Sequence, residues 1–78
     1  MNIKRLKSLR EDEDLKQQEV ADALNITRSA YSNYENGIRE IPLDLLIKLA
    51  NFYQTSVDYL VGLTDIKTPY PHKKQGRV

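Results

Sequence analysis

Two short helical patterns joined by a tight connection, within residues 16–37, constrain this chain of 78 residues more than any other feature. The stretch reads KQQEVADALNITRSAYSNYENG. At about 100° per residue on a helical wheel, the polar side chains of the second pattern share one arc of roughly 140°. They are Arg28, Ser29, Ser32, Asn33 and Asn36. The opposite arc holds Thr27, Ala30, Tyr31 and Tyr34. This helix is therefore expected to bury an aromatic back and to present a front made only of hydrogen-bonding groups.

The connection between the two patterns carries its own local signals. The first helix of the pair is expected over residues 17–24, and its small Ala21 lets the next helix cross closely. Asn25 tolerates the left-handed backbone conformation that ends a helix and turns the chain. The hydroxyl of Thr27 can cap the second helix. The spacing therefore predicts a helix, a tight turn and a second helix.

Three further helices are expected around this pair. The first covers residues 2–11, with Ile3, Leu6 and Leu9 toward the core, and the acidic run 11–14 is interpreted as a connector because like charges crowd there. A fourth begins near Pro42 and runs to about Tyr53. Its expected core residues are Leu45, Leu46, Leu49, Ala50 and Tyr53. A short fifth helix, residues 57–61, follows Ser56 as its cap and stops at Gly62. The predicted fold class is all-α, a compact domain of five helices.

Charge divides the chain into two parts. Residues 1–63 carry eight Lys/Arg against ten Asp/Glu, a net charge of −2, whereas residues 64–78 carry four against one, a net charge of +3. Residues 1–63 are predicted to form one domain. Residues 64–78 contain two prolines and few apolar side chains, so we expect a basic, flexible C-terminal tail. The domain lacks the strong positive field of a highly basic protein, and binding to an anionic partner would depend on where its few cations sit.

Composition argues against several classes of function. The chain has no Cys and one His, His72, so thiolate and multi-histidine metal sites are excluded. No glycine-rich phosphate loop and no Cys nucleophile occurs, and His72 lies in the expected tail, so we expect no enzyme, no catalytic residue, no metal and no cofactor. The charged N-terminus does not fit a signal peptide, and no apolar run is long enough to span a membrane. The expectation is therefore a cytoplasmic protein. A chain of this length is also expected to leave no room for a separate domain that senses small molecules.

Residues 17–37 resemble the helix-turn-helix of the phage repressor and Cro family, also called XRE-type, a large group of small bacterial and phage DNA-binding regulators. The resemblance extends over about residues 3–63. It includes QxEVA at residues 17–21, YENG at residues 34–37 and PLDLLIKLANFYQTSVDYLVG from Pro42 onward. Lys16 stands where the family commonly has Ser or Thr, and Asn25 where it commonly has Gly.

The resemblance implies that the second helix of the motif enters the major groove of double-stranded DNA with its N-terminal residues at base edges. Arg28, Ser29 and Asn33 are the best candidates for reading bases, because Arg can bond bidentately to guanine and Asn to adenine; Ser32 is a weaker candidate. Contacts to the DNA backbone are expected from a second group of polar residues. They are Gln17, Lys16, Asn36, Arg39 and Thr27. For each residue the alternative is a solvated polar side chain, while Tyr31 and Tyr34 are interpreted as core.

Family resemblance also suggests that Glu35 pairs with Arg10, tying the third helix to the first. The main hypothesis is a transcriptional regulator, a repressor, that binds a palindromic operator as a homodimer. Its self-association surface is expected at the fifth helix and its exit, unless some of these residues complete the monomer core. They are Val57, Leu60, Val61 and Leu63. The alternative hypothesis is a protein-interaction module on the same fold, such as an antitoxin or a regulator held by a protein partner.

Overall fold

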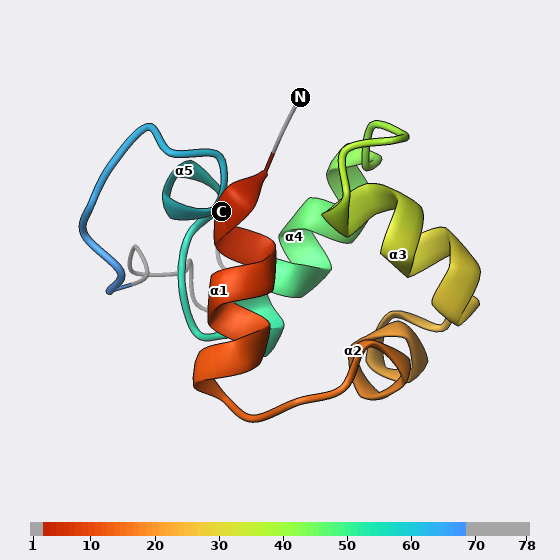
Figure 1. The fold of residues 1–78 in the computed structure, drawn as a ribbon. Coiled ribbons are helices and arrows are strands. Elements are labelled where there is room, and N and C mark those ends of the chain that lie inside the picture. Colours follow the sequence, from red (N-terminus) through yellow and green to blue (C-terminus); the bar gives the residue numbers. More distant parts are fainter. Residues whose placement is uncertain (1–2, 69–78) are drawn as a thin grey trace, which may run out of the picture.

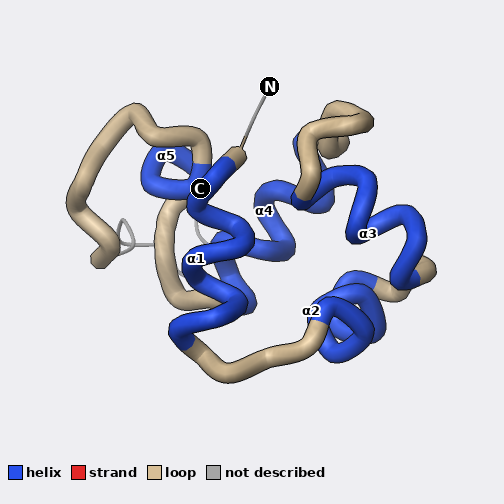
Figure 2. Tube along the Cα trace, in the orientation of Figure 1, coloured by secondary structure: helices blue, strands red, loops and turns tan. Residues whose placement is uncertain are grey.

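Five helices make up the regular structure of residues 3–68, the part of the chain that the computed structural model describes. They are α1 (Lys4–Asp12), α2 (Gln17–Leu24), α3 (Arg28–Glu35), α4 (Leu43–Phe52) and α5 (Val57–Leu60). Within these residues there is no β-strand, which confirms the predicted all-α class (Figure 2). In Figure 1, α2 and α3 project together to one side, while α1, α4 and α5 gather on the other.

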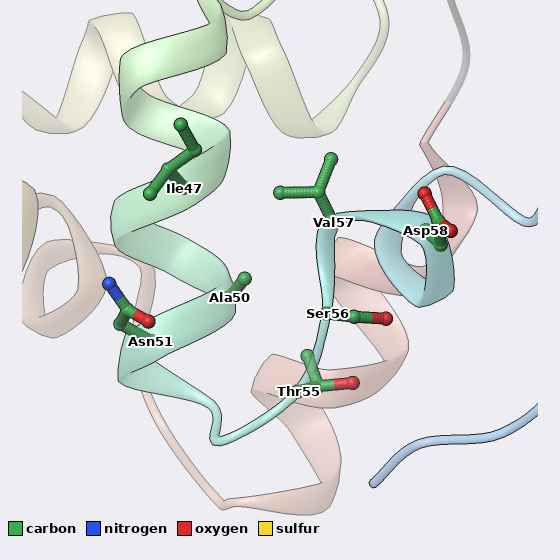
Figure 3. A pocket seen from close by; sticks show the side chains of 7 residues that line it. All are labelled: Ile47, Ala50, Asn51, Thr55, Ser56, Val57 and Asp58. Atoms are coloured by element: carbon green, nitrogen blue, oxygen red, sulfur yellow. The ribbon is translucent and has the colours of Figure 1, made fainter. Parts of the chain in front are cut away.

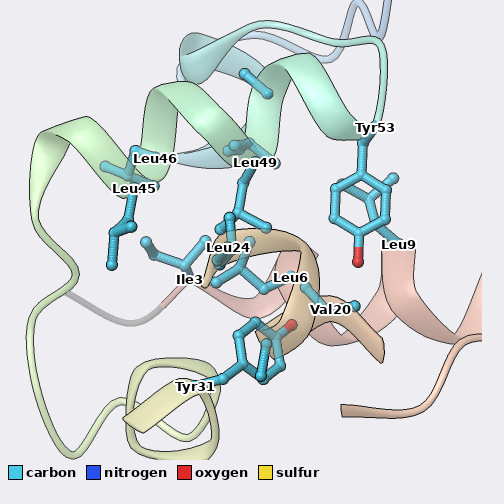
Figure 4. Close-up of a cluster of buried hydrophobic side chains, with 13 residues drawn as sticks. Ile3, Leu6, Leu9, Val20, Leu24, Tyr31, Leu45, Leu46, Leu49 and Tyr53 are labelled. Carbon is cyan, nitrogen blue, oxygen red and sulfur yellow. The ribbon is translucent and has the colours of Figure 1, made fainter. Parts of the chain in front are cut away.

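The core forms where apolar faces of all five helices meet (Figure 4). Leu6 of α1, Val20 of α2, Tyr31 of α3, Leu49 of α4 and Leu60 of α5 are almost completely buried. Each predicted core residue of α4 is also buried. Because these helices are short, tertiary packing of their apolar faces stabilises them more than intrinsic propensity does.

The interpretation of the acidic run as a connector is partly wrong. Helix α1 continues through Glu11 and Asp12, and only residues 13–16 connect it to α2. The carboxylates of the run are exposed, so water screens their repulsion. The helix ends at Asp12, and the chain turns away from it at Asp14, whose φ is 58°, where the N–H of Leu15 donates to the carbonyl of Arg10 at 2.9 Å.

Local capping signals are confirmed. Asn25 has φ 60° and ψ 42°, the left-handed conformation expected at the turn. The hydroxyls of Thr27 and Ser56 accept hydrogen bonds from the N–H groups of Ala30 and Tyr59, at 3.1 and 3.0 Å. Pro42 directly precedes α4, and α5 ends at Leu60, one residue earlier than expected.

The tail was expected to begin at residue 64, and hydrogen bonds to the helical body continue beyond that point. The hydroxyl of Thr55 donates to the carbonyl of Lys67 at 2.6 Å, and Arg5 donates to the carbonyl of Thr64 and the carboxylate of Asp65. Residues up to Lys67 are therefore bonded to the helical body. The rest of the predicted tail, residues 69–78 with His72, lies outside the described residues. None of the helices in residues 3–68 is long and apolar enough to cross a membrane.

Burial predicts which leucines of α4 the fold needs. Leu49 is 0% exposed and Leu43 is 65% exposed. We expect Leu49→Ala to lower the free energy of unfolding by about 2–5 kcal/mol, because it removes core contacts and leaves a cavity. The matched control Leu43→Ala should change it by less than about 0.5 kcal/mol. Urea unfolding followed by circular dichroism measures both, and equal losses would contradict the packing described above.

Candidate nucleic-acid interface

The outer face of α3 has the composition that its helical wheel predicted. Arg28 and Ser29 are exposed, and Ser32 and Asn33 are half-buried. Tyr31 faces inward and packs in the core. Tyr34 is partly buried against the core. The eight residues of α3 extend about 12 Å, which matches a major groove about 12 Å wide.

A buried ion pair joins α3 to α1. The Nε and Nη2 of Arg10 donate to the two carboxylate oxygens of Glu35, both at 2.9 Å, and the side chain of Glu35 is 1% exposed. The Nη1 of Arg10 donates to the carbonyl of Leu15 at 2.9 Å. All three guanidinium nitrogens are thus engaged inside the protein, so Arg10 has the structural role that the resemblance implied.

The charge of Glu35 depends on this pair. Burial raises the pKa of the Glu35 carboxyl and is the largest single influence on it, but the hydrogen bonds and positive charge of Arg10, together with the neighbouring side chains of Tyr31 and Gln17, lower that pKa below its usual value. The bond to Glu35 likewise raises the pKa of Arg10. Both groups are therefore charged at neutral pH, and each compensates the other in a poorly hydrated site.

Gln17 connects the ion pair to the surface of α3. Its Nε2 donates to Glu35 at 3.4 Å, and its Oε1 accepts from the Nη1 of Arg28 at 3.4 Å. From the sequence, only a contact of Gln17 with the DNA backbone was expected, and the hydrogen bonds that join Gln17 to Glu35 and Arg28 were not. Gln17 is the first residue of α2 and Arg28 the first residue of α3, and the turn at Asn25 brings these two helix starts together. The local sequence predicts the turn but not this contact in three dimensions.

The other expected backbone contacts lie around the two motif helices. Lys16 precedes α2 with its side chain exposed; no side-chain cap replaces the missing Ser or Thr, but the carboxylate of Glu19 accepts from the Lys16 N–H at 2.8 Å. Asn36 donates to the hydroxyl of Ser32 at 3.2 Å, so these two side chains are bonded to each other on the surface. Thr27 and Arg39 are exposed.

The expected self-association residues differ in burial. Leu60 is 1% exposed, so it cannot contribute to a surface. It completes the core of the monomer, which was the alternative expected for some of these residues. Val57 and Val61 are partly buried against the core, while Leu63 is 77% exposed. Within residues 3–68, no group of three or more His, Cys, Asp or Glu could hold a metal ion.

Comparison with known proteins places this arrangement in a family. The model of the helix-turn-helix family matches residues 6–60, which is more than half of the chain. The chain belongs to the helix-turn-helix family. The resemblance noted from QxEVA and YENG is thereby confirmed.

Relatives of the chain are named as regulators. It is 39% identical over 74 residues to the uncharacterized HTH-type transcriptional regulator YobD of Bacillus subtilis, covering 95% of this chain and 66% of that protein. It is 43% identical over 63 residues to the HTH-type transcriptional regulator ImmR of B. subtilis, covering 81% and 50%. The cryptic phage CTXphi transcriptional repressor RstR of Vibrio cholerae is 31% identical over 74 residues, covering 95% and 65%.

A solved structure has the same fold. The crystal structure of a transcriptional regulator from Listeria innocua matches with a TM-score of 0.70 and 26% identity, covering 92% of this chain and 61% of that one. The chain spans about half to two thirds of the length of the relatives named here. The family is one of DNA-binding transcriptional regulators and is not typically enzymatic.

The Arg10–Glu35 pair predicts how stability varies with pH. Folding lowers the pKa of Glu35 below its ordinary value of 4.5, so the contribution of this carboxylate to stability is present above that pH and is lost as the pH falls through the lower pKa of the folded state. We expect Glu35→Gln to cost about 3–5 kcal/mol at neutral pH, because it leaves the charge of Arg10 buried and unpaired. The difference from the unsubstituted chain should shrink under acid conditions.

Urea unfolding at neutral pH and at about pH 3 measures this difference. Glu13→Gln is the control, since Glu13 is exposed, and it should change stability by less than about 0.5 kcal/mol. The same pH dependence in the unsubstituted chain and in Glu35→Gln would show that the pair does not carry the acid sensitivity.

Proposed function

We propose that this chain binds double-stranded DNA in a sequence-specific manner and acts as a transcriptional repressor in the cytoplasm. The observation that carries the proposal is the face of α3, where exposed and half-buried hydrogen-bonding groups lie opposite the side of the helix that packs in the core. Such a face fits the base edges of a major groove, which present a distinct pattern of donors and acceptors for each base pair. The named regulators among its relatives support the same function.

Arg28 is the principal base-reading residue in this proposal. Its guanidinium is exposed at the N-terminal end of α3, and the bond from Arg28 to Gln17 restricts its orientation. An oriented guanidinium loses less conformational freedom when it bonds bidentately to guanine. Ser29 lies beside it on the same exposed end, and Asn33, one turn farther along, offers an amide to adenine. Ser32, which is bonded to Asn36, has a lesser role.

Contacts to phosphates set the register of the protein on DNA without reading sequence. The N-terminal end of α2 carries a partial positive charge from its unpaired N–H groups, and Lys16 adds a full charge next to it. Gln17 and Thr27 lie at the starts of α2 and α3, and Arg39 follows α3. These positions concentrate cations and donors around the motif even though residues 1–63 carry a net charge of −2.

The proposed active species is a homodimer on a palindromic operator. One module of this size makes few base contacts, whereas two half-sites about 34 Å apart on one face of DNA multiply the discrimination. The exposed side chain of Leu63, together with the outer parts of Val57 and Val61, supplies the self-association surface in this proposal.

Arg28→Ala tests the base-reading role. We expect it to weaken binding to the cognate site by about 1–3 kcal/mol and to change binding to random duplex very little, because a bidentate base contact exists only at the correct sequence. Fluorescence anisotropy with labelled duplexes at fixed salt measures both affinities. Lys4→Ala serves as the control, since Lys4 is an exposed cation at the first position of α1 and not part of the helix-turn-helix. Equal losses on cognate and random DNA would mean that Arg28 contacts phosphate only.

A further inference from the structure

The end of α3 places an exposed asparagine directly before a glycine. Asn36 caps the C-terminal end of α3, and Gly37 follows it with φ 75°, a conformation that glycine adopts without strain. Both residues are exposed. Because glycine has no Cβ, Gly37 does not shield its own backbone nitrogen from the side-chain amide of Asn36. The two groups that react with each other in the deamidation of asparagine are therefore neighbours at the surface.

The other asparagines in residues 3–68 each precede a bulky residue. They are Asn25 before Ile26, Asn33 before Tyr34 and Asn51 before Phe52. Exposure alone does not distinguish them, since Asn51 is also exposed and lines an open hollow of about 220 Å³ between α4 and the start of α5 (Figure 3). Asn51 and Phe52 both lie within α4, whose hydrogen bonds restrict the backbone. Asn36 differs because its neighbour is a glycine that lies outside the helix.

We propose that Asn36 is a site of spontaneous deamidation and that this reaction lowers the affinity of the chain for DNA. The backbone nitrogen of Gly37 gives up its proton to a base in water and attacks Cγ of Asn36. The N–Cγ bond forms, the Cγ–Nδ2 bond breaks, and Nδ2 leaves as ammonia, so that the two residues share a five-membered imide. Water opens the imide at either carbonyl carbon and gives aspartate or isoaspartate. The net change replaces the amide nitrogen with an oxygen from water, and no oxidant or reductant takes part.

Hydrogen bonds at the end of α3 slow this reaction in the folded chain. The Nδ2 of Asn36 donates to the hydroxyl of Ser32 at 3.2 Å, and the N–H of Gly37 donates to the carbonyl of Tyr34 at 3.2 Å. The ψ of Asn36 is 0°, so the nitrogen of Gly37 is eclipsed with the backbone nitrogen of Asn36 and points away from its side chain. The attack therefore requires the last turn of α3 to open. Helix ends open at little cost in free energy, so these bonds set the rate and do not prevent the reaction.

The consequence for DNA rests on the proposed function, because Asn36 is one of the residues expected to contact the DNA backbone. Deamidation replaces an amide donor with a carboxylate, which repels phosphates and lies at the negative end of the α3 dipole. Isoaspartate also adds a CH2 group to the main chain at residue 36. That change alters the turn in which the N–H of Arg39 donates to the carbonyl of Asn33 at 3.2 Å. The modification is irreversible without a repair enzyme, so binding is lost with time.

Peptide mapping tests the reaction without DNA. The full chain is incubated at mildly alkaline pH and digested with trypsin, and cleavage after Arg28 and Arg39 releases one peptide that contains both Asn33 and Asn36. We expect mass spectrometry to find aspartate and isoaspartate at Asn36 and an unchanged Asn33. The rate should rise with pH, because the attacking nitrogen must lose a proton. A chain that is digested without incubation is the control. An unchanged Asn36, or equal conversion at Asn33, would overturn the proposal.

A serine substitution tests whether the folded end of α3 sets the rate. Ser32→Ala removes the acceptor that holds Nδ2 of Asn36, so deamidation should become about 2- to 10-fold faster, the equivalent of one net hydrogen bond. Ser29→Ala is the matched control, since Ser29 is exposed near the other end of α3, and it should leave the rate unchanged. Equal rates in the two variants would overturn the role given to the Ser32 bond.

DNA affinity measured during the incubation tests the consequence. With a duplex that the chain has selected from a random pool, affinity should fall in proportion to the converted fraction, and Asn36→Asp should bind at least about tenfold more weakly than the unmodified chain. Asn36→Gln, incubated in parallel, should keep its own starting affinity, because its longer side chain does not form the five-membered ring. The bound duplex should slow conversion, because it covers Asn36.

The outcomes separate this proposal from the proposed function. Conversion at Asn36 that leaves DNA affinity unchanged would overturn the loss of binding even if recognition is sequence-specific. Conversion at Asn36 in a chain that selects no DNA sequence would contradict the proposed function and sustain the modification site. An affinity that falls equally fast in Asn36→Gln would assign the loss to another residue and overturn the role of Asn36.

Discussion

The paired charges of Arg10 and Glu35 hold the two helices of the helix-turn-helix, α2 and α3, in place against α1. Arg10 bonds the end of α3 through Glu35 and the approach to α2 through the carbonyl of Leu15. One side chain of α1 thus fixes both helices of the motif from behind. Burying two charges is costly in itself, and replacing such pairs by apolar residues is often neutral for stability. The contribution of the pair is therefore to geometry, because it holds α3 in one position relative to α1. Gln17 extends this order outward, from Glu35 to Arg28.

Affinity for DNA must come from a few well-placed groups, because the domain is mildly acidic by count. Long-range steering by net charge is weak in such a protein, and ionic strength screens it further. The cations that matter lie at helix starts and after α3, where N–H groups of the backbone also point outward. The acidic run beside them lies at the end of α1 and in the connector, on exposed positions. This distribution favours discrimination between sequences over general attraction to DNA, since base contacts contribute specificity and phosphate contacts contribute mostly affinity.

Much of the fold could be predicted from the sequence because its signals are local. Asn25, Thr27 and Ser56 mark turns and caps by their own chemistry, and the apolar spacing of α4 identifies its buried face. Helix α1 ends later than expected because its acidic residues are exposed and water screens their repulsion, which the order of charges along the chain does not reveal. The contacts of Arg5 could not be predicted, since its partners lie more than 50 residues away in the sequence. Leu60 was assigned to a surface because a one-turn helix does not reveal which side meets α1 and α4. The link from Gln17 to Arg28 depends on two helix starts meeting in space, which neither helix specifies alone.

The central claim is that the outer face of α3 distinguishes DNA sequences. Selecting bound duplexes from a random pool with the full chain tests this claim most directly. The account predicts enrichment of a palindromic consensus with half-site centres one helical turn apart, about 34 Å. Guanine should be the preferred base at a position that loses its preference when the selection is repeated with Arg28→Ala. A bound pool with no enriched sequence, at a salt concentration where binding still occurs, would contradict the account.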